Sequence, residues 1–193
     1  MNEHLQFLQA FLKNPLYVGA ISPSSPELAR AMIRGVEPDE NNVVLEIGVG
    51  TGAITKFLQP LVPNEKSYIG IEIDQALVET LHEKFPELLI VHANACNAAE
   101  IVENAGMGKV SYIISGLPFA SLPKNVREGI LAEVEKFMEK GCMFRTFQYA
   151  HGYLLPPAVK FREYMNERYG KPKRSALIVK NVPPAYTLTW KTD

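Results

Sequence analysis

The chain has 193 residues, of which 47% are hydrophobic, and a formal net charge of -1. This size and composition fit one domain with a substantial core. No apolar run approaches the ~18 residues of a membrane span, and no basic segment precedes a signal-like apolar core. We therefore expect a cytoplasmic protein, or one that is peripheral to the inner face of a membrane.

Cysteine and histidine are too sparse to suggest a metal site or a disulfide. Cys96 and Cys142 lie far apart without C-x-x-C partners, so we expect buried reduced thiols. The charge is uneven, because residues 150–193 carry eight Lys or Arg against three Asp or Glu. Three of these cations lie in the connector 170–174, which favours a solvated loop. Attraction to an anionic lipid surface or a nucleic acid backbone is the alternative.

Residues 1–40 are predicted to form a helical extension of the main domain, 41–193. Residues 2–13 have the pattern of an amphipathic helix, which Asn14-Pro15 ends. A second helix is predicted at 28–33, where Ser24 and Glu27 have the spacing of a capping box. The first helix is either a lid packed on its own domain or a membrane contact.

From residue 43 onward, predicted strands and helices alternate. The first expected strand begins at 43, and the others cover 67–72, 88–92, 110–115, 143–149, 176–179 and 186–190. The expected helices cover 51–58, 75–84, 98–104, 126–138 and 157–168. This order predicts an α/β, Rossmann-like fold: a mostly parallel, seven-stranded sheet with an antiparallel edge strand and helices on both faces.

The first strand runs into Gly48, Gly50 and Gly52, with Glu46 just before them. Such a turn lets a nucleotide-like ligand lie against backbone N–H groups, and the following helix directs its positive end at an anion. The third glycine comes one residue earlier than in the G-x-G-x-x-G dinucleotide fingerprint. An acidic residue ahead of G-x-G-x-G resembles the cofactor loop of class I S-adenosylmethionine-dependent methyltransferases.

Glu72 ends the next strand, twenty residues after Gly52, where a carboxylate can accept two hydrogen bonds from a ribose diol. The resemblance therefore implies S-adenosyl-L-methionine as cofactor and S-adenosyl-L-homocysteine as product. Asn94 stands where many members of the superfamily carry an Asp that binds adenine, and an amide oxygen can also accept that hydrogen bond. The candidate cofactor-binding residues are Glu46, Gly48, Gly50, Thr51, Gly52, Glu72, Ile73, Asn94, Ala95 and Ser115.

The fourth strand ends in Ser-Gly-Leu-Pro-Phe at 115–119. Ribosomal RNA adenine dimethylases carry an Asn or Asp at the head of a similar tetrad, where it binds the amine of adenine, whereas this chain has Gly116. The blocks 11–32, 115–123, 144–149 and 181–185 resemble the small bacterial phospholipid N-methyltransferases, which convert phosphatidylethanolamine towards phosphatidylcholine. This resemblance spans nearly the whole chain, although Val49 replaces the usual proline of that family's glycine loop.

The resemblance also implies catalytic residues at the end of the fifth strand. The phospholipid family places the tyrosine of a Phe-x-Tyr motif in the active site, and Tyr149 occupies that position. His151 is the other candidate to accept the proton that an ethanolamine ammonium must lose. The candidate substrate contacts are Tyr17, Ser22, Ser24, Ser25, Gly116, Leu117, Pro118, Phe119 and Arg145.

The sequence thus predicts an S-adenosylmethionine-dependent N-methyltransferase that acts on phosphatidylethanolamine at a membrane surface, without a metal and without an obligate protein partner. One alternative is an rRNA adenine N6-methyltransferase. Gly116 and the shortage of chain for an RNA-binding domain disfavour it, so nucleic acid is not the expected partner. The other alternative is a non-catalytic membrane or protein-binding module that retains a relic cofactor fold.

Overall fold

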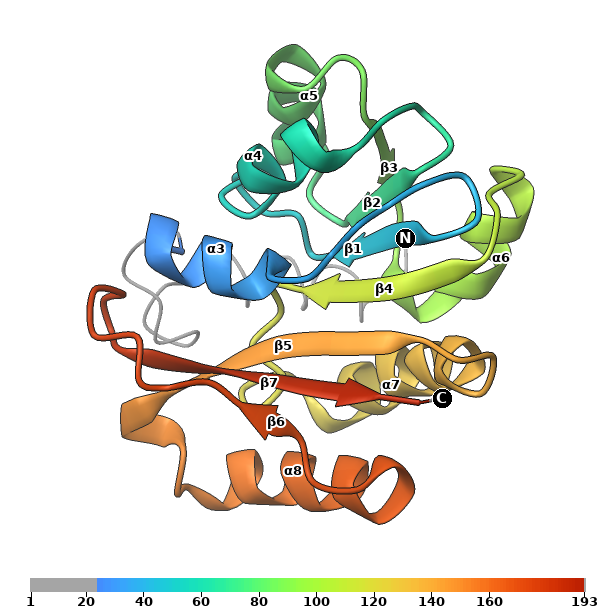
Figure 1. Ribbon diagram of the computed structural model, residues 1–193. Coiled ribbons are helices and arrows are strands. Elements are labelled where there is room, and N and C mark those ends of the chain that lie inside the picture. Colours follow the sequence, from blue (N-terminus) through green and yellow to red (C-terminus); the bar gives the residue numbers. More distant parts are fainter. Residues whose placement is uncertain (1–23, 193) are drawn as a thin grey trace.

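The computed structural model describes residues 24–192, which form a seven-stranded sheet between two layers of helices (Figure 1). The strands are β1 (Val43–Ile47), β2 (Tyr68–Glu72), β3 (Leu89–His92), β4 (Val110–Ser115), β5 (Met143–Tyr149), β6 (Lys173–Arg174) and β7 (Ala185–Lys191). The α-helices are α3 (Pro26–Ile33), α4 (Thr55–Leu58), α5 (Gln75–Lys84), α6 (Ala98–Asn104), α7 (Lys124–Met138) and α8 (Pro156–Tyr169). Short 3-10 turns are η1 (Gln59–Leu61), η2 (Ala95–Asn97) and η3 (Ala150–Gly152).

The strand order is β3-β2-β1-β4-β5-β7-β6. The pairs from β3 to β5 are parallel, whereas β7 runs antiparallel to both β5 and β6. The predicted mostly parallel sheet with an antiparallel edge is confirmed. The order reverses between β1 and β4, and in such sheets a crevice for ligands opens at the carboxyl ends of the strands.

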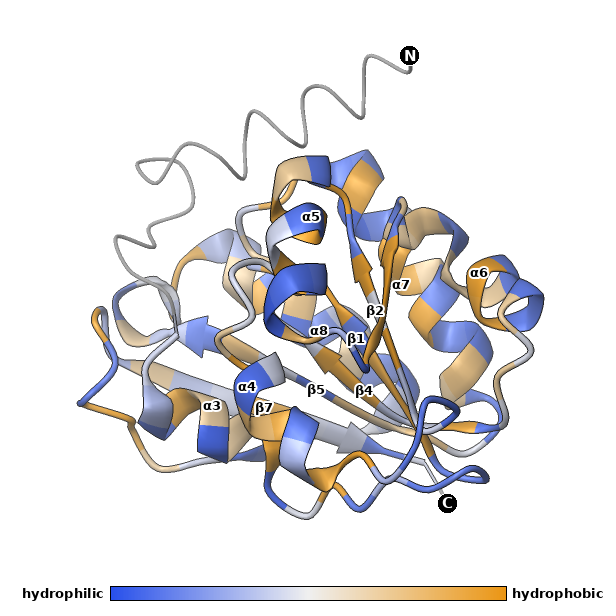
Figure 2. Cartoon of the chain, turned by 90° about the horizontal axis from the view of Figure 1, so that it is seen from above, coloured by the Kyte–Doolittle hydropathy of each residue, from blue (hydrophilic) through white to orange (hydrophobic). Residues whose placement is uncertain are grey.

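Both faces of the sheet are covered. Helices α3, α4 and α5 contribute to the hydrophobic core on one face, and α6, α7 and α8 to the core on the other (Figures 1 and 2). All five residues of β1 and of β2 are buried, which explains why these strands read as nearly continuous apolar runs in the sequence. In the described part of the chain, no helix is long and apolar enough to cross a membrane.

Two predicted helix starts are corrected by the backbone. The helix expected from Thr51 begins at Thr55, because Gly50 and Gly52 have φ angles of 61° and 81° that a right-handed helix cannot contain. The N-cap of α3 is Ser25 rather than Ser24, and its side chain accepts from the N–H of Leu28 at 3.1 Å. Pro26 fixes this start, since a proline holds the residue before it in an extended conformation.

The strand predicted at 176–179 does not form. The edge strand is β6, two residues earlier, and residues 176–179 contribute only an isolated bridge between Ile178 and Ala185. The remaining predicted strands and helices agree with the structure to within two residues. The predicted helix at 2–13, Tyr17 and Ser22 lie outside the described residues. The division of the chain at residue 40 stays a prediction, although α3 packs on the same sheet as the rest.

Candidate cofactor and active site

The glycine loop after β1 is held by a carboxylate at the end of the neighbouring strand. Because β1 and β2 pair in parallel, their carboxyl ends meet at one edge. The Gly50 N–H donates to Oε2 of Glu72 at 2.8 Å. The N–H groups of Ile73 and Asp74 donate to the other oxygen, Oε1, at 2.8 and 2.9 Å. A carboxylate has about four lone-pair sites, so Glu72 can accept one further hydrogen bond from a ligand.

The loop is open to a ligand at its centre. Gly48, Gly50 and Gly52 all have positive φ angles, where side chains are disfavoured. Among the described residues, nothing lies within 4 Å of the point where a Cβ of Gly50 would stand. A Cβ at Gly52 would stand 2.6 Å from the ring of Phe85, so this glycine lets the loop pack on the helical layer below.

Gly116, which follows β4, packs against the loop from the other side. Its N–H donates to the backbone oxygen of Ile47 at 3.1 Å. A Cβ at residue 116 would stand 2.8 Å from the backbone oxygen of Gly48. No side chain can therefore be added at this position unless the glycine loop moves.

Glu46 lies behind the loop, not in it. Because neighbouring residues of a strand point to opposite faces, its side chain lies beneath α4. The hydroxyl groups of Thr55 and Tyr68 donate to its Oε2 at 2.9 and 2.7 Å, and Oε1 has no hydrogen-bond partner among the described residues. Burial raises the pKa of Glu46 to about 7, although the two hydroxyl donors act in the opposite direction. In this structure the side chain of Glu46 joins α4 to β2, and its role as a cofactor contact stays a prediction.

A small cavity of about 20 Å³ lies at the carboxyl ends of the first four strands. It is lined by Gly48, Ile71, Glu72, Ile73, Ala93, Asn94, Ala95, Leu117 and Ile130. Five of these are predicted cofactor residues, and Leu117 is a predicted substrate contact. Ile130 was not predicted, because an apolar position of a helix gives no sign of whether it faces a ligand or the core.

The cavity holds about one water molecule in this conformation, whereas ligand pockets measure about 300 to 1,000 Å³. The cavity as it stands is therefore smaller than a nucleoside. The polar groups present, a carboxylate, an amide and backbone N–H groups, match a ribose, an adenine and an amino acid carboxylate.

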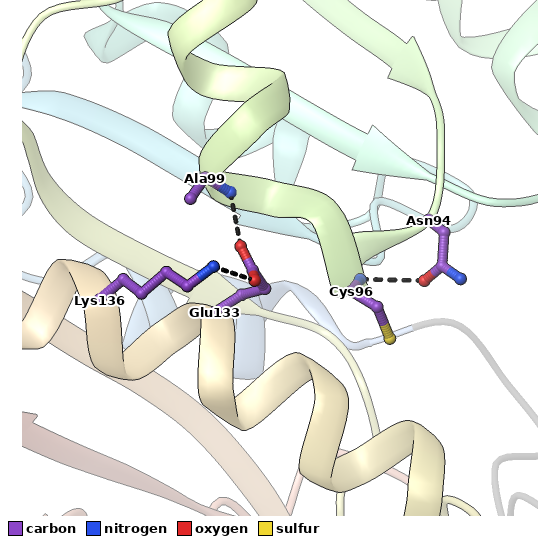
Figure 3. A network of polar contacts seen from close by, with 5 residues as sticks. All are labelled: Asn94, Cys96, Ala99, Glu133 and Lys136. Atoms are coloured by element: carbon purple, nitrogen blue, oxygen red, sulfur yellow. Dashed lines mark hydrogen bonds and ion pairs between the residues drawn. The ribbon is translucent and has the colours of Figure 1, made fainter.

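Asn94 begins the segment that closes the cavity on the β3 side (Figure 3). Its Oδ1 accepts from the N–H of Cys96 at 2.9 Å and so caps η2. Glu133 of α7 accepts from the N–H of Ala99 at 2.8 Å and pairs with Lys136 at 2.6 Å. These contacts fasten the cavity wall to α7. The second lone pair of Oδ1 can accept from the amino group of an adenine.

Tyr149 ends β5 at the same edge of the sheet, two strands away from β1. Its ring stacks on His151, with centroids 5.7 Å apart, and meets Phe147 edge-on. Partial burial raises the pKa of the Tyr149 hydroxyl. The phenol therefore keeps its proton near neutral pH and is suited to orienting an amine, not to acting as a strong base. Neither Tyr149 nor His151 lines the small cavity.

Several residues predicted to contact ligands belong to the framework. Ser115 is buried, and its Oγ donates to the backbone oxygen of Ile47 at 3.3 Å and accepts from the N–H of Leu117 at 3.2 Å. Phe119 is buried with its ring stacked on Phe161 at a centroid distance of 5.0 Å. The backbone oxygen of Pro118 accepts from the N–H groups of the turn that follows.

Arg145 is not at the carboxyl edge, because it lies four residues before the end of β5. Its Nη1 donates to the backbone oxygens of Met32 and Arg34 at 2.9 and 2.8 Å, and Nε donates to Oγ1 of Thr189 at 2.8 Å. The guanidinium thus holds the end of α3 on the sheet. It faces a separate cavity of about 520 Å³ that Lys173 also lines.

Ser24, Ser25 and Thr51 do not line the small cavity. Ser25 caps α3, Ser24 is half-buried beside it, and Thr51 is exposed in the glycine loop. Within residues 24–192 there is no group of three or more His, Cys, Asp or Glu side chains that could hold a metal ion.

Comparison with known proteins agrees with this geometry. The profile of the family described as ribosomal RNA adenine dimethylase matches residues 1–150. An ornithine lipid N-methyltransferase of Singulisphaera acidiphila is 28% identical over 141 residues, which cover 72% of this chain and 73% of that protein. A ribosomal RNA small subunit methyltransferase A of Cupriavidus metallidurans is 29% identical over 92 residues, which cover 48% of this chain and 32% of that enzyme.

Solved structures share the fold at low sequence identity. A SAM-dependent methyltransferase from Anabaena variabilis has a TM-score of 0.63 at 14% identity and covers 100% of this chain and 96% of its own. The M. capricolum protein TrmK in complex with S-adenosyl-homocysteine has a TM-score of 0.58 at 11% identity, over 86% of this chain and 68% of its own.

The fold, the glycine loop and the acid that holds it define a class I S-adenosylmethionine-dependent methyltransferase. The match over residues 1–150 shows that the chain belongs to the ribosomal RNA adenine dimethylase family. It is therefore an enzyme that uses S-adenosylmethionine. The alternative of a non-catalytic binding module that retains a relic cofactor fold is set aside.

Replacing Glu72 by Gln is expected to weaken S-adenosylmethionine binding by roughly 10- to 100-fold. An amide has one acceptor oxygen, so it cannot accept from Gly50 and from the two N–H groups beyond β2 together. Isothermal titration calorimetry measures the change, with Glu79→Gln on the exposed side of α5 as the matched control. Unchanged affinity in a folded Glu72→Gln protein would contradict the assigned role.

Replacing Glu46 by Gln is expected to remove a pH dependence of the free energy of unfolding. The pKa of Glu46 is about 7 in the folded protein against an ordinary value of 4.5, so in this interval the unfolded chain releases a proton that the folded protein keeps. The contribution of protonated Glu46 to the free energy of unfolding is fully present below pH 4.5. It is lost, by about 3 kcal/mol, as the pH rises to about 7. Urea unfolding of both proteins at pH 5 and pH 8 tests this, and identical pH profiles would refute it.

Proposed function

We propose that this enzyme methylates the primary amine of a phospholipid head group, with phosphatidylethanolamine as the acceptor. The observation that carries the proposal is the packing of Gly116. The adenine dimethylases that the sequence resembles place an Asn or Asp here to bind the adenine amine. In this chain the backbone oxygen of Gly48 fills the space that such a side chain needs. An adenine amine would lack its acceptor.

The relatives support a lipid acceptor. The ornithine lipid N-methyltransferase matches about three quarters of both chains, so its likeness includes the segments that follow the cofactor site. The match to the rRNA methyltransferase of Cupriavidus metallidurans covers only 32% of that enzyme. N-methylation of a lipid amine is also the reaction that the resemblance to phospholipid N-methyltransferases implies.

The residues at the small cavity have the chemistry to hold the cofactor. Glu72 would bind the ribose hydroxyls, Asn94 the adenine, and the N–H groups of the glycine loop the amino acid end. S-adenosylmethionine supplies an already activated methyl group. The protein then has to hold a neutral amine in line with the bond to that methyl group and to keep water away.

The acceptor amine must first lose a proton. The aromatic pair of Tyr149 and His151 offers ring faces on which an ammonium can rest. The phenol oxygen of Tyr149 accepts a hydrogen bond from the ammonium and orients it. His151 is exposed beside it, where an imidazole can take the proton and pass it to water. The amphipathic segment 2–13 would hold the enzyme at the membrane surface, and Tyr17 and Ser22 remain predicted substrate contacts.

Methyl transfer from radiolabelled S-adenosylmethionine to phosphatidylethanolamine vesicles tests the proposal directly. Ornithine lipid vesicles and unmethylated small-subunit rRNA serve as parallel acceptors. We expect transfer to phosphatidylethanolamine and none to rRNA. Transfer to rRNA without transfer to either lipid would show that adenine is the substrate and that Gly116 does not exclude it.

Replacing Tyr149 by Phe is expected to lower kcat on phosphatidylethanolamine by roughly 10- to 100-fold, because the amine loses the group that orients it. The affinity for S-adenosylmethionine should not change, since Tyr149 does not line the cofactor cavity. Tyr169→Phe, at the far end of α8, is the matched control. Equal activity of Tyr149→Phe and the control would remove Tyr149 from the mechanism.

A further inference from the structure

Two loops at the carboxyl edge of the sheet expose large aliphatic side chains. The exposed fractions are 83% for Leu154, 56% for Leu155, 40% for Leu177, 65% for Val179 and 67% for Val182. Within residues 24–192, only two other large apolar side chains, Leu61 and Leu89, are exposed. Single exposed aliphatic residues are ordinary, whereas a group of five on adjoining loops marks a surface that meets something apolar.

The two loops lie side by side at the left of Figure 1. One joins β5 to α8, and the other joins β6 to β7. The N–H of Ala150 in the first loop donates to the backbone oxygen of Pro184 in the second at 2.7 Å. The rings of Tyr153 and Tyr186 meet with centroids 5.1 Å apart. We call the five aliphatic residues of these loops the docking surface.

The second loop is fixed in a way that keeps its aliphatic side chains outside. Asn181 is buried, and its Oδ1 accepts from the N–H of Ser25 at 2.9 Å while its Nδ2 donates to the backbone oxygen of Pro183 at 2.6 Å. Lys180 pairs with Glu27 of α3 at 3.7 Å. The side chain of Asn181 thus faces the domain, whereas Val179 and Val182 on either side are exposed.

The segment that contains β6 and the second loop is basic. Residues 170–185 contain Lys171, Lys173, Arg174 and Lys180 but no Asp or Glu. Aliphatic side chains beside basic ones are the composition that binds the interface of an anionic bilayer: the former enter the head-group layer and the latter meet lipid phosphates. The docking surface also adjoins the proposed catalytic residue, because Tyr149 pairs directly with Ala185, where the first loop begins and the second ends.

We propose that the docking surface inserts into the head-group layer of an anionic phospholipid bilayer and thereby brings lipid amines to Tyr149. The delivery of the amine rests on the proposed function, whereas insertion does not. The docking surface would therefore be a second site of contact with the bilayer, independent of the predicted amphipathic segment at 2–13.

Vesicle flotation of the full chain tests insertion. Vesicles of phosphatidylethanolamine and phosphatidylglycerol are used with the wild type and with Leu154→Ser/Val182→Ser, which changes one residue on each loop. We expect the partition coefficient to fall at least about tenfold, because two apolar side chains no longer enter the bilayer. The matched control is Leu61→Ser/Leu89→Ser, which makes the same kind of change away from the docking surface and should float like the wild type. Equal flotation of all three proteins would overturn the inference.

A soluble acceptor separates this inference from the proposed function. On short-chain phosphatidylethanolamine below its micelle concentration, Leu154→Ser/Val182→Ser should transfer methyl groups as fast as the wild type, while its rate on vesicles falls. If the wild type methylates neither lipid, the proposed function fails, and flotation still decides insertion. If the substitutions abolish a concentration-dependent dimer in sedimentation but leave flotation unchanged, the surface binds a second copy of the chain and the inference is wrong.

Discussion

The carboxylate of Glu72 is the contact on which the site depends. It accepts hydrogen bonds from three backbone N–H groups, one in the glycine loop and two beyond its own strand. Charge-assisted hydrogen bonds of this kind are stronger than neutral ones. They hold two chain segments more than twenty residues apart in one geometry, and the parallel pairing of β1 with β2 places both at the edge where a ligand can reach them.

The sequence predicted the parts of this arrangement that follow from local rules. The glycines form the turn that was expected after β1, and Glu72 ends the next strand beside it. Alternating strands and helices predicted the sheet, because strands buried on both faces are apolar throughout. These features depend on residue types within a few positions of one another, or on a fixed connection length.

Features that depend on tertiary contacts were not predictable. The face to which Glu46 points is decided by Thr55 and Tyr68, which lie on other elements. Arg145 was predicted to contact the substrate, but its guanidinium donates to the end of α3, whose position the sequence does not reveal. The apolar run at 176–179 predicted a strand, whereas Leu177 and Val179 are exposed on a loop.

The residues predicted to bind the cofactor differ from those predicted to contact the methyl acceptor. The glycine loop and Glu72 are predicted cofactor contacts, whereas predicted acceptor contacts follow β4 and the predicted catalytic residues lie at the end of β5. Gly116 packs so closely on Gly48 that it supports the loop instead of reaching a substrate. The loop that begins after Tyr149 exposes Leu154 and Leu155, which accords with the proposed lipid acceptor.

The most direct test of the account is a titration of the isotopically labelled protein with S-adenosylhomocysteine, followed by the shifts of its backbone amide resonances. The account predicts the largest changes at Gly48, Gly50, Ile73 and Ala95, which surround the small cavity. Changes confined to the cavity beside Arg34 and Lys173, with the glycine loop unaffected, would contradict it.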